Sequence, residues 1–134
     1  LKSIDRNAFR ELENYLEEII LEFDATIVDR IPHAIQTNLA NIKILTLIGL
    51  NLRILPSNIF NQMKKLESLT LKSCNIQFIE TNAFNLIEHQ LRYLYLDYNK
   101  LNKKEATNES PEFIMLEKNT KVLIQLLMLF PVQS

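Results

Sequence analysis

Residues 66–76 read LESLTLKSCNI, and this spacing of leucine and isoleucine returns at three other places in the chain. The four rows begin at Leu16, Ile42, Leu66 and Leu91, so successive rows start 26, 24 and 25 residues apart. The third and fifth residues after each start are also leucine or isoleucine: Ile19 and Leu21, Leu45 and Leu47, Leu69 and Leu71, and Leu94 and Leu96. A fixed period of this length predicts one stacked-repeat architecture rather than an ordinary globular domain.

A second apolar column lies farther along each unit and has the same period. Its members are 26, 25 and 24 residues apart: Phe9, Ile35, Phe60 and Phe84. Residues 52–60 and 76–84 place their apolar side chains at the same spacing, and residues 1–9 open the chain with the same half-unit. Two columns that agree on one period indicate that each unit has a strand-forming part and a separate outer part.

These units resemble leucine-rich repeats, whose pattern is L-x-x-L-x-L-x-x-N/C-x-L followed by a late phenylalanine. The period of about 24 residues and the outer segment I-x-x-I-x-x-x-x-F are similar to the repeats of animal extracellular and cell-surface proteins such as Toll-like receptors, Slit and chaoptin. Plant-type repeats and the short cytosolic type fit less well, since this chain has one glycine and longer units. The resemblance implies an α/β fold: a right-handed solenoid with a short parallel sheet on its concave face and irregular or short-helical convex segments.

The repeats are expected to cover residues 1–102, about three-quarters of the chain. They divide into a half repeat and four units: 1–15, then about 16–41, 42–65, 66–90 and 91–102. Residues 103–134 are predicted to form a polar loop and an apolar, helical tail or cap, whose apolar part spans 111–132. The alternatives for this tail are a truncated membrane or signal-like segment and a poorly folded end of a fragment. Asn108 begins a weak N-glycosylation sequon.

The ninth position of a leucine-rich repeat normally carries asparagine, whose amide satisfies backbone groups at the turn after the strand. Here the position holds Asp24, Leu50, Cys74 and Asn99. Asn99 matches the pattern, Cys74 is the commonest substitute and Asp24 mimics asparagine, but Leu50 departs from it. The second turn is therefore expected to be less regular, with its backbone groups left to water or to a neighbour. Cys74 is interpreted as a small buried filler without reactivity.

Composition excludes several classes of function. Fifteen basic and 16 acidic side chains give a net charge of −1, which supplies no electrostatic footprint for nucleic acid. The lone glycine, Gly49, excludes glycine-rich loops that bind phosphates and dinucleotides. The lone cysteine excludes a disulfide within the chain and leaves a tetrahedral zinc site without ligands. The longest apolar stretch falls short of the roughly 20 residues of a spanning helix, so we expect membrane contact only through segments outside this chain.

No pattern points to an enzyme. The two histidines, His33 and His89, are 56 residues apart and fall in the outer segments of different units. We expect no catalytic, cofactor-binding or metal-binding residues, no cofactor and no small-molecule substrate. A hydrolase stays an alternative only if the two histidines are adjacent in space. The acidic cluster of Glu17, Glu18 and Glu22 is interpreted as a solvated rim, with a cation site or a patch for a basic partner as alternatives.

The outward residues of the predicted strands form the candidate binding site. Side chains alternate along a strand, so Leu69 and Leu71 face the core while the residues between and around them face outward. In leucine-rich repeats, partners usually bind this concave face. The predicted protein-binding residues are Glu18, Ile20, Glu22, Phe23, Ile44, Thr46, Ile48, Ser68, Thr70, Lys72, Tyr93, Tyr95, Asp97 and Tyr98. An apolar patch and three tyrosines in one row favour an interface. Two alternatives are that these residue types occur there only because they favour β-strands, and that the C-terminal tail covers part of this face.

We therefore hypothesise a protein–protein interaction module that binds a protein ligand, or a like repeat domain, through its concave face, as in cell-surface receptor or adhesion proteins. Its expected location is extracellular or at the cell surface, with the cytoplasm as the alternative. A structural or adhesive segment that self-associates through its repeats and an intracellular regulatory scaffold are the alternative functions. The chain is expected to be a fragment of a longer protein.

Overall fold

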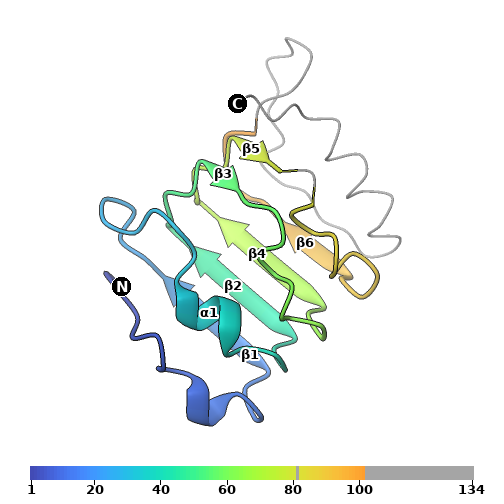
Figure 1. The fold of residues 1–134 in the computed structure, drawn as a ribbon. Coiled ribbons are helices and arrows are strands. Elements are labelled where there is room, and N and C mark those ends of the chain that lie inside the picture. Colours follow the sequence, from blue (N-terminus) through green and yellow to red (C-terminus); the bar gives the residue numbers. More distant parts are fainter. Residues whose placement is uncertain (81, 102–134) are drawn as a thin grey trace.

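The computed structural model describes residues 1–80 and 82–101, which form a solenoid of parallel strands (Figure 1). The elements in chain order are η1 (Arg10–Leu12), β1 (Glu18–Glu22), α1 (His33–Thr37), β2 (Ile44–Ile48), β3 (Ile54–Leu55), β4 (Ser68–Lys72), β5 (Phe78–Ile79) and β6 (Tyr93–Tyr95). Four strands form one parallel sheet in the order β1-β2-β4-β6, with one turn of the solenoid between each pair of neighbours. The predicted solenoid of stacked parallel strands is confirmed.

The apolar rows lie in register across this sheet. Ile19 pairs with Leu45, Leu45 with Leu69, and Leu69 with Leu94. These side chains point to one face, and in β2, β4 and β6 they are fully buried. At the edge strand β1, Ile19 and Leu21 are only half-buried, since within the described residues no further row stacks on them.

The outer segments close the other side of the core. They contain the five-residue helix α1, several turns, and a second parallel sheet of only β3 and β5 (Figure 1). The second apolar column lies here: Ile35, Phe60 and Phe84 are fully buried and Phe9 is half-buried. The rings of Phe60 and Phe84 stack with centroids 6.2 Å apart and planes at 4°. The two columns of the sequence are therefore the two sides of one apolar core.

The chain leaves the sheet through a left-handed backbone conformation in three successive rows. The residue two positions after the last leucine of the row has a φ of +80° at Gly49, +53° at Ser73 and +58° at Tyr98. A Cβ atom on Gly49 would lie 2.7 Å from the backbone oxygen of Phe23 in the neighbouring row. The lone glycine therefore stands where a left-handed turn coincides with a close backbone approach.

Asn99 satisfies backbone groups of the preceding row. Its Oδ1 accepts hydrogen bonds from the N–H groups of Cys74 (3.0 Å) and Ile76 (3.1 Å). Its Nδ2 donates to the carbonyl oxygen of Leu71 at 2.6 Å and to that of Asp97 at 3.3 Å. The side chain is 5% exposed, so these bonds replace water at a turn that water does not reach.

Leu50 occupies the equivalent position one row before Cys74, and it is buried. Neighbouring rows accept the backbone N–H groups of its turn: Asn51 donates to the carbonyl of Val28 at 3.0 Å, and Leu52 to that of Cys74 at 2.9 Å. The next left-handed residue is Arg53 in this row but Asn75 in the following one. The expected irregularity of the second turn is observed, and its backbone groups bond to neighbours.

The predictions for the C-terminal part lie outside the described residues. They concern the polar loop and apolar tail at 103–134, with the sequon at Asn108 and the apolar segment 111–132. Within the part of the chain that the structure describes, no helix combines the length and the apolar character that crossing a membrane requires.

Candidate protein-binding face

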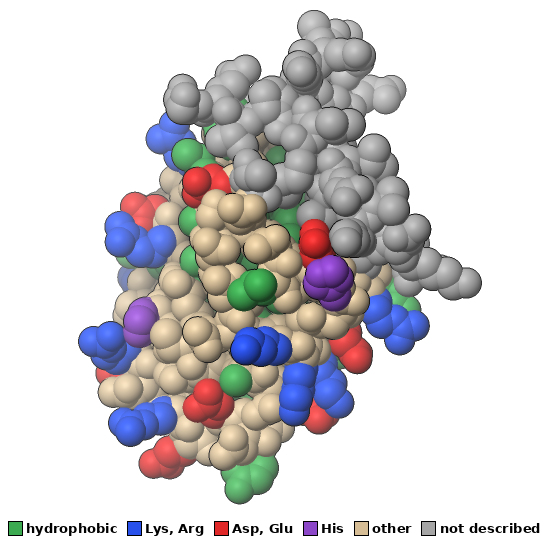
Figure 2. All heavy atoms as spheres, turned by 45° about the vertical axis from the view of Figure 1, so that its right-hand side comes forward, with side chains coloured by type: hydrophobic (Ala, Val, Ile, Leu, Met, Phe, Trp, Pro, Cys, Tyr) green, Lys and Arg blue, Asp and Glu red, His purple; other side chains and the backbone are tan. Residues whose placement is uncertain are grey.

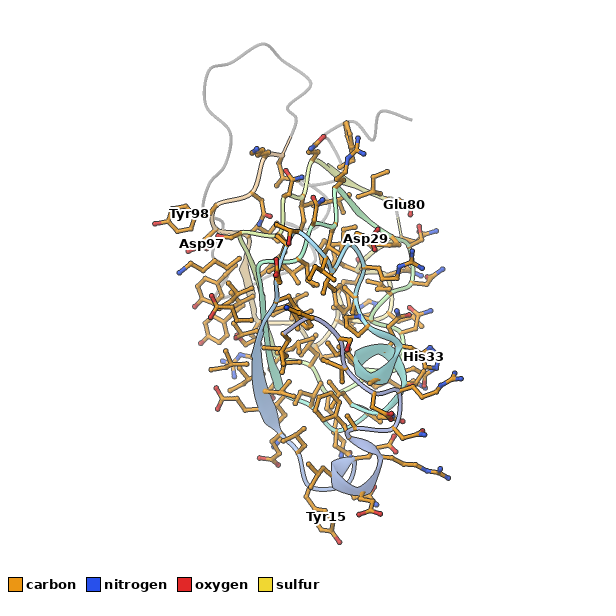
Figure 3. All side chains as sticks on the ribbon, turned by 90° about the vertical axis from the view of Figure 1, so that its left-hand side faces the viewer. Tyr15, Asp29, His33, Glu80, Asp97 and Tyr98 are labelled. Atoms are coloured by element: carbon orange, nitrogen blue, oxygen red, sulfur yellow. The ribbon has the colours of Figure 1, made fainter. Side chains whose placement is uncertain are left out.

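One face of the four-stranded sheet is left bare by the rest of the described chain. Figure 3 views the sheet along its edge, with Asp97 and Tyr98 on the bare side and His33 and Glu80 on the opposite side. Parallel sheets are normally covered on both faces. Here large apolar side chains reach water instead: Ile20 is 63% exposed and Ile44 is 38% exposed. We call the outward side chains of β1, β2, β4 and β6, together with Asp97 and Tyr98, the open face.

Thirteen of the fourteen predicted binding residues belong to the open face. They are Glu18, Ile20 and Glu22 from β1, Ile44, Thr46 and Ile48 from β2, Ser68, Thr70 and Lys72 from β4, Tyr93 and Tyr95 from β6, and Asp97 and Tyr98 after it. All of them are exposed or half-buried, whereas the residues that alternate with them in β2, β4 and β6 are buried. The alternation in the sequence therefore predicted that these side chains face away from the core.

The prediction for Phe23 is wrong. Its side chain is 6% exposed and belongs to the apolar core. Gly49, Ser73 and Tyr98 occupy the equivalent position with positive φ, but Phe23 does not. Its N–H donates to the carbonyl oxygen of Ile48 at 2.8 Å, which holds this backbone against the next row. Without the left-handed turn, the ring enters the core instead of facing outward.

Three tyrosines gather at the β6 end of the open face. The rings of Tyr93 and Tyr95 stack with centroids 6.5 Å apart and planes at 10°. The guanidinium of Arg92 lies 5.9 Å from the centre of the Tyr93 ring, and the ammonium of Lys72 lies 5.5 Å from that of Tyr98. These contacts order large amphipathic side chains in advance, which lowers the entropy cost of binding through them.

Tyr98 combines exposure with an unfavourable backbone conformation. It is 66% exposed, and its φ of +58° is a region that bulky side chains rarely occupy. The equivalent residues of the two preceding rows are Gly49 and Ser73, which are small. The Tyr98 ring is therefore exposed at a turn position that small residues fill in the two preceding rows.

The β1 end of the open face is acidic. Glu18 and Glu22 are exposed and flank Ile20 on the same side of the strand. Glu17, which directly precedes β1, pairs with Lys43 at 3.3 Å. Among the described residues, neither Glu18 nor Glu22 forms an ion pair. Both carboxylates therefore lie beside an exposed isoleucine, and the Leu1 ammonium donates to the carbonyl oxygen of Glu22 at 2.8 Å.

Small polar side chains separate the acidic end from the aromatic end. The register aligns Thr46 with Thr70 and Thr70 with Tyr95, and it aligns Ile44 with Ser68. Threonine and serine expose hydroxyl groups that can donate and accept hydrogen bonds. Across the four strands, one line of aligned residues is Glu18, Ile44, Ser68 and Tyr93, and the next is Ile20, Thr46, Thr70 and Tyr95.

Two features of this face are not apparent from the repeat pattern. Arg92 lies over the ring of Tyr93, although the pattern places it before the strand, and only its position next to a tyrosine signals the contact. The Oδ1 atom of Asp97 is buried and lacks a hydrogen-bond partner within the described residues. Buried acceptors of this kind are uncommon in folded proteins.

The two histidines have separate surroundings. The Nε2 atom of His33 lies 3.2 Å from a guanidinium nitrogen of Arg6, and that of His89 lies 3.8 Å from the carboxylate of its neighbour Glu88. Both histidines are exposed, and Figure 2 shows them as two separate purple groups on the surface. Within residues 1–80 and 82–101, no group of three or more histidine, cysteine or acidic side chains is arranged to hold a metal ion.

Among the residues that the structure describes, two titratable groups have shifted pKa values, and both shifts have local causes. Burial raises the pKa of the Cys74 thiol to about 11, opposed by weaker hydrogen bonds from the backbone at Leu50 and Gly49. Hydrogen bonds from the hydroxyl and then the N–H of Thr26 lower the pKa of Asp24. Asp24 thus stabilises its own turn as an acceptor, and Cys74 is a neutral core side chain.

Cys74 is expected to resist alkylation in the folded protein. The thiolate is the reactive form, and at pH 8 a pKa of about 11 leaves roughly one thiol in a thousand ionised, in addition to the steric protection of complete burial. Mass spectrometry after iodoacetamide treatment should show modification only in denaturant. Because the pKa is 9.0 without these effects, the unfolded chain loses this proton first, so stability should fall as pH rises from about 9 to about 11. Rapid alkylation of the native protein would contradict this assignment.

Comparisons of the whole chain with protein-family models, with curated proteins and with solved structures find no match.

Proposed function

We propose that this chain is a leucine-rich-repeat solenoid that binds a protein ligand through its open face and carries out no chemical reaction. The repeat assignment is supported by the sequence pattern together with the in-register pairing of equivalent rows. Further support comes from Asn99, which bonds to backbone groups of the preceding row at the position where leucine-rich repeats place asparagine.

The observation that carries the binding proposal is the set of apolar and aromatic side chains left in water on one face. Ile20, Ile44 and Tyr98 are all exposed there, beside the stacked pair of Tyr93 and Tyr95. Burying such side chains at an interface contributes roughly 25 cal/mol per Å² of apolar surface, and tyrosine is among the residues that most often dominate binding energy. Three steps between four strands span only about 14 Å, so we expect modest affinity from this face alone.

The test is a display library of protein fragments from the source organism, screened with the 134-residue chain. Fragments captured by the wild type should bind the double variant Tyr93→Ala/Tyr95→Ala at least tenfold more weakly, because each ring is a preordered contact. Leu86→Ala is the matched control, since Leu86 is also exposed but belongs to an outer segment. Equal affinity for the wild type and the tyrosine variant would exclude the open face.

Tyr98→Asn separates binding from folding in the same screen. Asparagine tolerates the left-handed conformation, so its backbone gain of up to about 1 kcal/mol offsets the lost contact with Lys72, about 0.5–1 kcal/mol at an exposed site. The melting temperature should therefore change little while fragment binding weakens. Unchanged binding would remove Tyr98 from the proposed site.

A second candidate function is self-association, which the edge strand β1 favours. Within the described residues β2 is the only strand that pairs with β1, although Leu1 bonds to the backbone of Glu22 and Asp24 at the end of β1. Ile19 and Leu21 are half-buried, whereas their counterparts in the interior strands are fully buried. An open strand edge is a template for pairing with another chain. Analytical ultracentrifugation distinguishes self-association from ligand binding. A chain that stays monomeric at every soluble concentration would exclude self-association. From the outer-segment pattern we propose an extracellular or cell-surface location for either function.

A further inference from the structure

The open face is electrically polarised from one end to the other. Its β1 end carries Glu18 and Glu22 without a cation paired to either among the described residues. The opposite end carries Lys72 and Arg92, each placed over a tyrosine ring. Arg92 directly precedes β6, and the equivalent positions of the other rows hold Glu17, Lys43 and Glu67, while Asp97 follows β6. A basic side chain of a partner is thus attracted by the glutamates of β1 and repelled by Lys72 and Arg92.

Ile20 makes the acidic end a binding site for a long basic side chain rather than for a free ion. It is 63% exposed and lies two residues from each glutamate along the same side of β1. The aliphatic stem of a lysine or arginine can cover this isoleucine while its charged head reaches Glu18 or Glu22. The stem contacts Ile20 and the charged head contacts a glutamate at the same time only when the basic side chain lies along the face.

The distance across the sheet sets the spacing in the partner. Three strand-to-strand steps of about 4.8 Å place β1 about 14 Å from β6, and an extended chain advances about 3.4 Å per residue. About four residues therefore separate a side chain over Ile20 from one against Tyr95. Between them, the hydroxyl groups of Thr46 and Thr70 face the backbone of a segment that crosses the strands.

We propose that the open face binds an extended protein segment that places a lysine or arginine over β1 and an apolar or aromatic side chain against the tyrosines of β6, about four residues apart. This inference rests on the proposed function and adds the chemistry and direction of the ligand. The cations at the β6 end fix the direction, because the reversed segment would bring its basic residue against Lys72 and Arg92.

The test is a selection from a displayed library of random dodecapeptides, using the full 134-residue chain as bait. Wild type should enrich lysine and arginine about four positions from an apolar or aromatic residue, at least threefold over the input library. The variant Glu18→Lys/Glu22→Lys should enrich aspartate and glutamate there instead. The control Glu11→Lys/Asp29→Lys makes the same change of net charge at exposed sites in η1 and an outer segment, so it should select the wild-type motif.

Tyr93→Ala/Tyr95→Ala distinguishes failure of this inference from failure of the proposed function. Peptides that need the tyrosines but lack basic enrichment, or that the glutamate variant selects unchanged, would overturn the inference and leave the open face as the site. Glu18 and Glu22 would then serve only to keep the edge strand from pairing. A selection without any tyrosine-dependent peptide would overturn the proposed function itself. Melting temperatures within a few degrees of wild type establish that each variant is folded.

Discussion

Replacing Asn99 with alanine is expected to lower the free energy of unfolding by about 3–5 kcal/mol. The substitution leaves three buried backbone groups without their partner: the N–H groups of Cys74 and Ile76 and the carbonyl oxygen of Leu71. An unsatisfied buried group costs about 1–3 kcal/mol, and the total stability of a small protein is only about 5–15 kcal/mol. Urea denaturation followed by circular dichroism measures the difference.

The control for this prediction is Asn85→Ala, which changes the same residue type at an exposed position of an outer segment. Its effect should stay within about 0.5 kcal/mol, as for most surface substitutions. Asn99→Asp is informative as well, because aspartate keeps the acceptor for Cys74 and Ile76 but loses the donor to Leu71. We expect the free energy of unfolding of Asn99→Asp also to be lower than that of wild type. A loss below about 1 kcal/mol for Asn99→Ala would mean that the amide does not hold the rows together.

Replacing Gly49 with alanine is expected to cost about 2–4 kcal/mol. The left-handed conformation alone costs a residue with a Cβ atom about 1–2 kcal/mol. The new Cβ would also lie 2.7 Å from the backbone oxygen of Phe23, a distance at which something must move. Phe23 has little room to yield, since its N–H bonds to Ile48 and its ring is in the core. Thermal and urea denaturation both measure the loss.

Ser73→Ala is the matched control for Gly49→Ala. Ser73 occupies the same turn position one row later, with a φ of +53°, and already carries a Cβ atom. Both substitutions therefore place an alanine in a left-handed backbone conformation, but Ser73→Ala adds no atom near a neighbouring row. Equal effects of the two substitutions would show that the close approach to Phe23 contributes nothing.

Much of the fold was predictable because a strict period constrains every unit at once. The spacing of Leu45, Leu69 and Leu94 places them in register, and the alternation along each strand assigns their neighbours to the open face. The outer column of phenylalanines was equally visible, and Phe60 stacks on Phe84 because equivalent residues of adjacent rows must meet.

The repeat pattern does not predict the burial of Phe23. Its position in the row matches those of Gly49, Ser73 and Tyr98, yet its side chain lies in the core. Whether the residue after a strand faces water depends on the sign of one backbone angle. A periodic pattern records spacing and polarity but not that sign, and a phenylalanine is compatible with either outcome.

For this protein, the sequence alone determined the architecture, the two columns of the core and the side of the sheet on which the candidate site lies, because these follow from spacing along the chain. Only the tertiary structure decided which members of the site act together. Lys72 contacts the ring of Tyr98, which lies 26 residues later in the chain, and Asn99 bonds to Leu71, which lies 28 residues earlier. Among the described residues, Glu18 and Glu22 form no ion pair. The physical reason is that side-chain pairing between rows depends on rotamers and turn conformations, which vary by ångströms while the period stays the same.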